Sequence, residues 1–478
     1  MPRTDSRVLA LDLGTSSSRA LVLSPDLSPV EGALARHKIT PTYGVGGSAT
    51  LDLHDYVEGL LGCLDELQQN GHLTDISDIV LSSQWHSIVA LSSSGEPLTP
   101  VIPWVDTRSV PATVGASFDE RAFHARTGAW LHRLYWPRRI PWLQSIVSPS
   151  SYAGLPDLVL ERLTSERVTS VSIASGTGTL DLASGLYDAE ALAIAGVSES
   201  QLPAIVSTGW TGVLSSAFER RWPALAGVPI HPPTGDGAAS NVGTGGFDET
   251  TAAVTVGTSA AVRVVHPIEG APELPWELWR YRVDDKRAVT GMAFSAAGNL
   301  HAWLTGVLQL DAEHQEPTGI QIGSSRVIGI PFQAGTRPPE TVPGGSGAYF
   351  GLSFDDTAAD LLAASLQGAS LEIDRGLRML DSLFGSSLQV VLGGGGIDAS
   401  AWWRNCLTAT FARPTEVCAE AEVGARGAAA VALGLSPAPG GESLQPVPAD
   451  VDRVAVLRPR YDFLRSLAVQ AASTGTSS

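Results

Sequence analysis

The sequence predicts an α/β protein with two domains of like topology, and two observations support this prediction. Short apolar segments of strand length alternate with longer segments in which apolar residues recur at helical spacing. In addition, the strand, turn and strand pattern of residues 10–19 recurs at residues 253–263, about half of the 478-residue chain later. The matched turn residues are Gly14 with Gly257, Thr15 with Thr258, and Ser16 with Ser259. A repeat this long indicates duplicated domains rather than a short-period solenoid, although Gly-Thr-Ser is common in turns and coincidence is the alternative.

Each half is predicted to begin with a β-hairpin and to continue with helices and a buried strand. Residues 53–67 and 358–380 place their leucines on one face at helical spacing. In chain order the predicted elements are strands at 8–13 and 20–23, a helix at 53–67, a strand at 79–81, a second hairpin at 253–262, a helix at 358–380, a strand at 388–392, a helix at 402–411, a loop at 435–450 and a helix at 459–472.

The composition argues against several classes of protein. The formal net charge is −18, from 31 Lys and Arg against 49 Asp and Glu, whereas binders of nucleic acid or anionic membranes need a basic face. The two lysines, Lys38 and Lys286, lie outside any Walker A sequence, so main-chain N–H groups, hydroxyls, arginines and a metal would have to hold ATP phosphates. Three cysteines without CxxC spacing, no signal peptide and no long apolar run predict a cytoplasmic protein.

The first hairpin carries a candidate metal and phosphate site. Asp12 lies near the end of the first strand, two residues before the hydroxyl-rich turn that begins Gly14, Thr15 and Ser16. A carboxylate beside N–H and O–H donors suits Mg²⁺ bound with a polyphosphate. The second hairpin has Thr255 in place of Asp12, so it offers donors without the negative charge. The alternative is an ordinary hairpin with a solvated aspartate.

Asp236 is the candidate catalytic base. It lies between Gly235 and Gly237 just before the second hairpin, in a segment typical of a strand-to-helix turn that a ligand can approach closely. Phosphoryl transfer depends on positioning the hydroxyl more than on strong basicity, so an ordinary aspartate suffices. The alternative is an aspartate that only caps the helix.

Four consecutive glycines at residues 393–396 follow a predicted buried strand and precede a helix. Backbone without side chains admits a flat ring or a nucleotide close to the helix start. A plain strand-to-helix turn is an equal alternative.

Two segments of the first half combine aromatic and polar residues at predicted strand ends. The candidate substrate residues in them are Gln84, Trp85, His86, Trp104, Asp106 and Arg108. A ring face with several donors and acceptors is suited to a polyol. The alternatives are a core histidine at position 86 and a surface ion pair between Asp106 and Arg108.

Residues 121–139 form a basic and aromatic segment without an acidic residue in an otherwise acidic chain. Such a segment is suited to an anionic substrate or to a contact between the subunits of a homodimer, and an ordinary helix surface is the alternative.

Taken together, these segments resemble the FGGY family of carbohydrate kinases from about residue 9 to residue 433. The sequence Asp-Leu-Gly-Thr-Ser from Asp12 looks like the first phosphate motif of the family, and Gly-Asp-Gly-Ala-Ala around Asp236 looks like its catalytic motif. Val256 to Ser259 looks like the second phosphate motif, and the glycines at 393–396 look like the adenosine motif. The resemblance implies two actin-like, ribonuclease-H-like domains with a catalytic cleft between them, a small-molecule sugar substrate, and ATP and Mg²⁺ as cofactors.

The resemblance also implies roles for the residues and domains. Residues 1–245 would form the sugar-binding domain with Asp236 as base and Asp12 at the metal, and residues 246–478 the ATP-binding domain, with a frayed tail at about 471–478. Thr15 and Ser16, after Gly14, would face the inner phosphates. Gly257, Thr258 and Ser259 would face the γ-phosphate, and Gly394, Gly395 and Gly396 would border adenine.

Within the family, the segments around Gln84, Asp106 and Asp181 look most like those of gluconokinases, with xylulokinases and other ketose or polyol kinases as the alternative. Two departures affect the sugar assignment: Trp85 where members often have Met, and Gly-Thr-Arg at 335–337 where members often have Gly-Glu-Arg. A catalytically inactive actin-like regulator that binds a sugar or nucleotide is a further alternative, which the presence of Asp12 and Asp236 disfavours.

Overall fold

A computed structural model describes residues 6–310, 315–385, 387–398, 400–438 and 440–475. The chain forms two compact units. Unit 1 comprises Met1–Gly243, Val265–Thr290 and Glu422–Pro437, and unit 2 comprises Thr244–Val264, Gly291–Ala421 and Ala438–Ser478. The first change of unit, after Gly243, falls close to the division expected after residue 245. Unit 1 also contains two segments from the second half of the chain, and the assignment of functions to the two halves stays a prediction.

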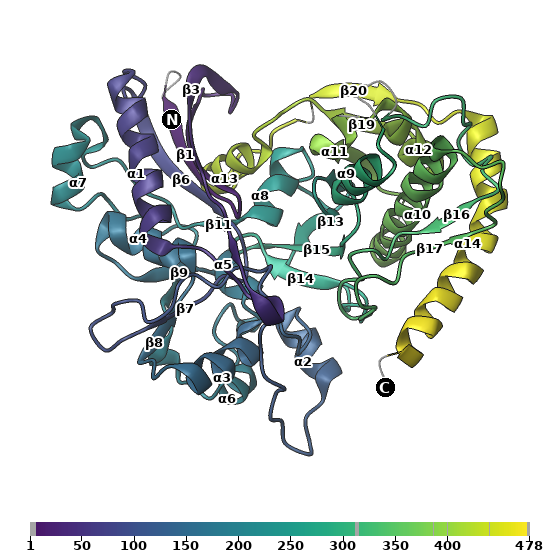
Figure 1. Cartoon of the computed structure of the whole chain (residues 1–478). Helices are drawn as coiled ribbons and strands as arrows, with labels where there is room; N and C mark the ends of the chain where they lie inside the picture. The colour runs from purple at the N-terminus through teal and green to yellow at the C-terminus, as the bar shows by residue number, and fades with distance from the viewer. Residues whose placement is uncertain (1–5, 311–314, 386, 399, 439, 476–478) are drawn as a thin grey trace. The chain divides into compact units, whose positions relative to one another are not determined.

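The sheet of unit 1 is built on the predicted hairpin (Figure 1). Its strand order is β11 (Thr234–Gly235), β6 (Ile76–Ser83), β1 (Arg7–Leu13), β2 (Ser17–Leu23) and β3 (Pro29–Lys38). Strand β1 pairs antiparallel with β2 and parallel with β6, and β11 adds to the far side of β6. The sequence predicted β1, β2 and β6 as strands but not β3, whose outer face is largely exposed.

The second hairpin repeats this topology, as the duplicated sequence predicts. It lies in a seven-stranded sheet of order β20 (Gly441–Leu444), β19 (Thr415–Cys418), β18 (Gln389–Gly393), β12 (Thr251–Val256), β13 (Ala260–Pro267), β15 (Arg287–Phe294) and β14 (Trp279–Arg282), whose five strands from β19 to β15 correspond to those of the first sheet. The registers also correspond, because Asp12 lies beside Ser82 on β6 and Thr255 lies beside Gly393 on β18. The prediction of an α/β fold with two actin-like domains is therefore confirmed.

Helices and short strands complete the two units. Unit 1 has α1 (Leu53–Gln69), α2 (Glu120–Thr127), α3 (Trp136–Ile146), α4 (Leu155–Thr164), α5 (Val171–Gly176), α6 (Ala189–Ala195), α7 (Ser216–Arg221), α8 (Asp236–Gly243) and α13 (Val423–Leu433), with strands β4 (Thr42–Tyr43), β5 (Ala49–Thr50), β7 (Val89–Leu91), β8 (Ser151–Ala153), β9 (Val168–Ser170), β10 (Ala204–Val206) and β14 (Trp279–Arg282). Unit 2 has α9 (Gly298–Val307), α10 (Ala358–Phe384), α11 (Gly395–Asp398), α12 (Ala401–Phe411) and α14 (Pro448–Gly475), with strands β16 (Ile328–Ile330), β17 (Ala348–Phe350) and β20 (Gly441–Leu444).

The C-terminal region differs from the sequence prediction in two ways. The expected loop at 435–450 contains β20, which pairs antiparallel with β19 and forms the edge of the sheet on that side. The last helix begins at Pro448 rather than at residue 459, so Pro459 lies inside it. Proline disfavours a helix interior, but Val454 and Tyr461 are both buried, so packing of this helix face outweighs the local signal. The helix continues to Gly475, and residues 476–478 of the expected tail lie outside the described residues.

The core of unit 1 lies between its sheet and the helices α1 and α4. Leucines of β1 and of α1 are almost fully buried in one cluster with Leu160 and Leu163 of α4. Helix α1 begins at the cap Asp52, whose carboxylate accepts a hydrogen bond from the Asp55 N–H at 2.8 Å. This packing holds Tyr56, in the first turns of α1, against the hairpin turn. Among the described residues, no helix is long and apolar enough to cross a membrane.

Candidate active site

The first hairpin turn is the meeting point of three predicted segments. The Tyr56 hydroxyl donates to the Gly14 carbonyl at 2.8 Å, and Gln84 Nε2 donates to the same carbonyl at 3.3 Å. The Thr15 hydroxyl donates to Gln84 Oε1 at 3.2 Å and accepts from Trp104 Nε1 at 2.9 Å. The fold therefore brings Thr15, Gln84 and Trp104 together, and the Thr15 hydroxyl holds the two predicted substrate segments to the turn. Ser16, at the tip, is exposed.

Asp12 is buried in a charge network that the sequence did not reveal. Its Oδ2 lies 2.6 Å from Arg19 Nη2, and Arg19 Nη1 lies 2.6 Å from Glu422. Burial raises the pKa of Asp12, while the charge of Arg19 and the Ser82 hydroxyl act in the opposite direction. The carboxylate is thus oriented by Arg19 from the neighbouring strand.

The surroundings of Asp12 fit a water-mediated Mg²⁺ ion. A Cβ placed on Gly424, at the start of α13, would lie 3.7 Å from Asp12 Oδ1 and 3.5 Å from Ser82 Oγ, so the glycine leaves space beside these oxygens. Mg²⁺ keeps several waters and is commonly bound through one or two carboxylates plus phosphates. Within the described part of the chain, no group of three or more His, Cys, Asp or Glu side chains is placed to hold a metal alone. A single carboxylate with phosphate is therefore the arrangement that suits these residues.

Asp236 begins α8 directly after the two-residue strand β11. Its Oδ1 accepts a hydrogen bond from the Gly237 N–H at 2.7 Å, and its carbonyl accepts from Ser240 Oγ at 2.7 Å. Burial raises the pKa of Tyr56 well above its usual value, and the negative charges of Asp12 and Asp236 raise it further. Both carboxylates therefore act on one phenol, which places them in the same neighbourhood of unit 1.

A close helix crossing fixes Asp236 with respect to Asp12. A Cβ on Gly427 of α13 would lie 1.7 Å from the Ala239 carbonyl of α8, and a Cβ on Gly243 would lie 1.9 Å from the Val423 carbonyl. Such short approach is compatible only with glycine, so the two helix backbones are in direct contact. Since α8 begins with Asp236 and α13 begins beside Asp12, this crossing sets the relation between the two carboxylates.

Asp106 and Arg108 form the ion pair that the sequence left as an alternative. The buried Asp106 carboxylate accepts from the N–H of Ala49 at 2.8 Å and from Arg108 Nη2 at 2.6 Å, and the guanidinium lies over the Trp142 ring. Both groups already have protein partners. Contact of Asp106 and Arg108 with a substrate stays a prediction. The geometry supports a role for the Asp106 carboxylate in orienting the Arg108 guanidinium.

The side chain of Arg139 connects the predicted sugar segments by hydrogen bonds to their carbonyl groups. It is completely buried and donates to the carbonyls of Arg133 at 3.2 Å, His86 at 3.0 Å and Asp106 at 2.6 Å. Burial lowers its pKa to about 10, which leaves it charged at neutral pH. His86 has a positive φ of 70°, and its Nδ1 bonds to the Gly176 carbonyl. The loop of the basic segment is thereby tied to the loops of His86 and Asp106.

His124, near the start of the basic segment, belongs to a packed aromatic cluster. His124 of α2 is buried, its Nε2–H donates to the Leu278 carbonyl at 2.8 Å, and its ring stacks on Trp130 with centroids 5.3 Å apart. Burial, with the charges of Arg280 and Arg121 in addition, lowers the pKa of His124 to about 4. The imidazole is therefore neutral at physiological pH.

The low pKa of His124 predicts a loss of stability in acid. Between pH 6.5 and about 4 the unfolded chain binds a proton that the folded chain does not, so this residue lowers the free energy of unfolding by up to about 3 kcal/mol as pH falls through that window. Urea unfolding measured at pH 7, 6, 5 and 4 should show this slope in the wild type and a shallower slope in His124→Gln. His54→Gln, which removes an exposed imidazole of α1, is the control, and equal slopes in all three proteins would contradict the assignment.

In unit 2, the second turn and the tetraglycine come together. A Cβ on Gly394, which has a φ of 102°, would lie 2.5 Å from the Val256 carbonyl, and a Cβ on Gly396 would lie 3.4 Å from the Gly257 carbonyl. The Gly257 carbonyl accepts from the Gly298 N–H at 2.9 Å. Of the remaining predicted residues, Thr258 and Ser259 lie in the second turn, and Gly395 begins the short helix α11. Unit 2 therefore brings the second turn, the glycines at the start of α11 and the start of α9 side by side, and the sequence predicted the first two of these.

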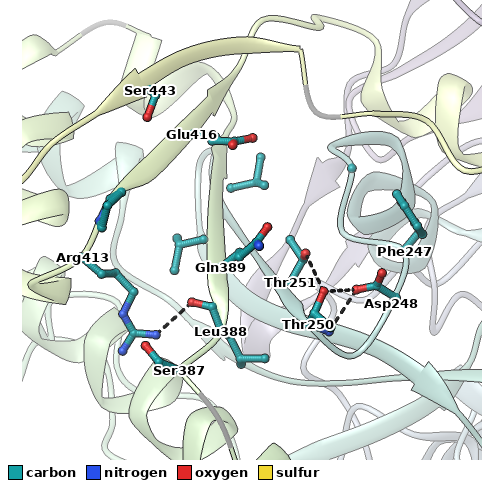
Figure 2. Close-up of a pocket in the computed structure, with 14 residues that line it drawn as sticks. Phe247, Asp248, Thr250, Thr251, Ser387, Leu388, Gln389, Arg413, Glu416 and Ser443 are labelled. Atoms are coloured by element: carbon teal, nitrogen blue, oxygen red, sulfur yellow. Dashed lines mark hydrogen bonds between the residues drawn. The ribbon is translucent and has the colours of Figure 1, made fainter.

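Two cavities of unit 2 differ in their relation to these turns. One of about 540 Å³ is lined by Asn299, Trp303 and Tyr349 among others, and the Asn299 N–H bonds to the Thr258 carbonyl at 3.1 Å. The other, of about 490 Å³, lies at the starts of β12, β18 and β19, the opposite strand ends from the glycines (Figure 2). Its polar wall includes Asp248, and its Arg413 is already paired with Asp381. The first cavity therefore has a lining residue, Asn299, bonded to the predicted phosphate turn.

Sequence reasoning missed several residues that the fold places near predicted residues of the same unit. Tyr56, Ser82, Ser172, Tyr281, Gly298, Glu422 and Gly424 come from segments without a recognisable motif. The regular spacing of α1 indicated that Tyr56 would be helical but not which atoms its hydroxyl would reach. The others carried no local signal.

Comparison with known proteins identifies the family of the chain. The model of the N-terminal domain of the FGGY family of carbohydrate kinases matches residues 7–243, and the model of the C-terminal domain matches residues 252–434. The gluconokinase of Bacillus subtilis (strain 168) is 25% identical over 435 residues, covering 85% of this chain and 83% of the relative. The xylulose kinase of Streptomyces rubiginosus is 29% identical over 454 residues, covering 90% and 88%.

Solved structures share the fold. The gluconate kinase from Lactobacillus acidophilus aligns with a TM-score of 0.86 at 21% identity, covering 98% of this chain and 99% of that one. A xylulose kinase from the same organism aligns with a TM-score of 0.85 at 21% identity, covering 99% and 100%. Because the two domain models together match well over half of its length, this chain belongs to the FGGY family of carbohydrate kinases.

Proposed function

We propose that this kinase transfers the γ-phosphoryl group of ATP to the terminal hydroxyl of an open-chain sugar acid, D-gluconate, giving 6-phosphogluconate and ADP. The observation that carries the sugar assignment is the charge around the predicted sugar segments. Arg108, Arg133 and Arg139 gather there with one carboxylate, Asp106, in a chain whose formal net charge is −18. A carboxylate that leaves water needs a charge-assisted partner, and this excess of positive charge supplies one.

The residues take the following roles in this proposal. Asp236 accepts the proton of the hydroxyl as its oxygen forms a bond to the γ-phosphorus, and the bond from that phosphorus to the β-phosphate oxygen breaks. Thr15 and Ser16, after Gly14, face the inner phosphates. Gly257, Thr258 and Ser259 face the γ-phosphate, and Gly394, Gly395 and Gly396 border adenine. Asp12 would hold Mg²⁺ through water, and the ion would supply positive charge to the phosphates.

A panel of substrates with coupled detection of ADP tests this function. D-gluconate, D-xylulose, glycerol and other polyols should be offered with ATP and Mg²⁺, and the largest kcat/KM is expected for gluconate. Preference for xylulose or another uncharged polyol would overturn the gluconate assignment and leave the kinase activity standing. ADP release with none of them, with sugar or ATP still bound, would favour the inactive regulator.

Arg133 provides a test of the carboxylate itself. Its side chain is exposed. Arg139 donates hydrogen bonds both to the carbonyl of Arg133 and to the carbonyl of His86, which keeps the two backbone segments close together. Arg133→Gln should raise KM for gluconate at least tenfold, about 1.4 kcal/mol or more, with KM for ATP nearly unchanged. Arg108→Ala is a less clean variant, because it would leave the buried Asp106 carboxylate without its cation.

The matched control is Arg220→Gln, which removes an exposed charge from α7 in the same unit. Steady-state kinetics of the two variants should differ in KM for gluconate alone. Equal KM values for gluconate would remove Arg133 from the substrate site.

A further inference from the structure

We infer that Trp85 is a positioning residue for Asp236, acting through the backbone of Gly235 rather than by contact with the sugar. The observation behind this inference is the place of its indole ring, which is 5% exposed and lies on the peptide just before Asp236. The inference rests on the proposed function, in which Asp236 receives the proton of the substrate hydroxyl.

The direction of the indole is fixed by its one polar atom. Trp85 follows β6, and its Nε1–H donates to the Ser172 carbonyl at 3.0 Å in a buried position. Indole has a single donor and no acceptor, so this bond leaves the ring nothing to offer a sugar hydroxyl except its face. Around that face, Tyr281 packs edge-on with ring centroids 4.9 Å apart, and the Tyr281 hydroxyl bonds to that of Tyr135 at 2.6 Å.

The same ring fills the space over two glycines. A Cβ on Gly235 would lie 1.9 Å from Nε1 and Cε2 of Trp85, and a Cβ on Gly176 would lie 2.4 Å from its Cδ1. No side chain fits at either position without moving the indole. The ring is therefore held between the end of α5 and the peptide that leads into α8.

Ser172 links the indole to Gly235 a second time. Its carbonyl accepts from Trp85, and its hydroxyl accepts from the Gly235 N–H at 3.0 Å. Strand β11 has only two residues, which pair with Ser82 and Ser83 of β6. The backbone pairing with β6 alone therefore holds β11 only weakly in position. The steric contact of Trp85 and the Ser172 bond together complete the placement of Gly235 and hence of the residue that follows it.

Phosphoryl transfer is sensitive to this kind of placement, since a misplacement of about 1 Å can lower a rate by about 100-fold. Trp85→Phe keeps an aromatic ring but loses the Nε1–H and the benzo ring that covers Gly235. We expect it to lower kcat by about tenfold or more while KM for the sugar and for ATP change by less than about threefold. If Trp85 instead contacted the sugar, KM for the sugar would rise first, and that result would overturn the inference.

A double-mutant cycle tests the steric contact directly. Gly235→Ala should lower kcat strongly in the wild-type background, because its Cβ meets the indole, and much less in a Trp85→Leu background, where that space is empty. Additive losses in the double variant would contradict the contact. Trp222→Phe is the matched control: it removes another fully buried indole and its 2.9 Å bond to Asp65 in the same unit, and kcat should stay at the wild-type value.

Hydrogen exchange separates this inference from the proposed function. The amide of Gly235 should exchange faster in Trp85→Leu than in the wild type and at the wild-type rate in Trp222→Phe, whether or not any sugar is phosphorylated. An inactive wild type with this exchange pattern would refute the proposed function and retain the positioning role. Unchanged exchange at Gly235 in Trp85→Leu would refute the positioning role even in an active kinase.

Discussion

Asp236→Asn should reduce kcat by about a thousandfold or more, which corresponds to about 4 kcal/mol of transition-state stabilisation. The amide has nearly the same shape and still accepts from the Gly237 N–H, but it cannot take the proton of the sugar hydroxyl. Sugar and ATP should still bind, because the segments proposed to hold them remain. Steady-state turnover, together with calorimetric titration of each ligand, separates loss of chemistry from loss of binding.

The control for this change is Asp52→Asn, which makes the same substitution at another helix start. Asp52 caps α1 through its bond to the Asp55 N–H, and asparagine caps nearly as well. Its turnover should match that of the wild type. An Asp236→Asn enzyme that kept a rate within about tenfold of the wild type would show that the base has been assigned to the wrong residue.

Gly427→Ala should strongly destabilise unit 1. The added Cβ would lie 1.7 Å from the Ala239 carbonyl and 2.7 Å from the Gly243 N–H, and these backbone atoms cannot rotate away. Helices α8 and α13 would have to separate, with a loss of about 3 kcal/mol or more of unfolding free energy. Because the crossing also sets Asp236 with respect to Asp12, turnover should fall in the fraction that still folds.

Gly62→Ala is the matched control, since it adds the same methyl group to a helix of the same unit. Gly62 lies inside α1 with no atom within 4 Å of the added Cβ, so the change should raise stability by about 0.5 to 1 kcal/mol through helix propensity. Urea unfolding of the two variants measures the difference. A Gly427→Ala protein as stable as the wild type would mean that α8 and α13 are not in backbone contact.

The parts of the site that the sequence predicted are those whose chemistry lies within a few consecutive residues. Gly14 to Ser16, Asp236 and the glycines at 393–396 each combine small residues with a donor or a carboxylate at a turn. The repeat of the first turn at Gly257 also predicted the repeated sheet topology, because a strand, turn and strand pattern specifies its own local pairing.

The sequence indicated much less about the state of individual side chains. Asp106 and Arg108 were expected to line a polyol site, whereas in the structure they are hydrogen-bonded to each other. Trp85 was expected to contact the sugar, whereas its indole N–H donates to the Ser172 carbonyl. The last helix was placed too late because Pro459 is a strong local signal, whereas burial of Val454 and Tyr461 is a tertiary effect.

The sequence by itself therefore determined the α/β class, the duplicated hairpin and the candidate residues for phosphate and proton chemistry, because strand length, turn composition and charge are local properties. Only the tertiary structure decided which of these residues meet. The contacts of Tyr56 with Gly14, of Arg19 with Glu422 and of Gly427 with Ala239 join positions up to 403 residues apart. Such contacts depend on how whole elements pack, and the need for glycine at a helix crossing arises only when the second helix is in place.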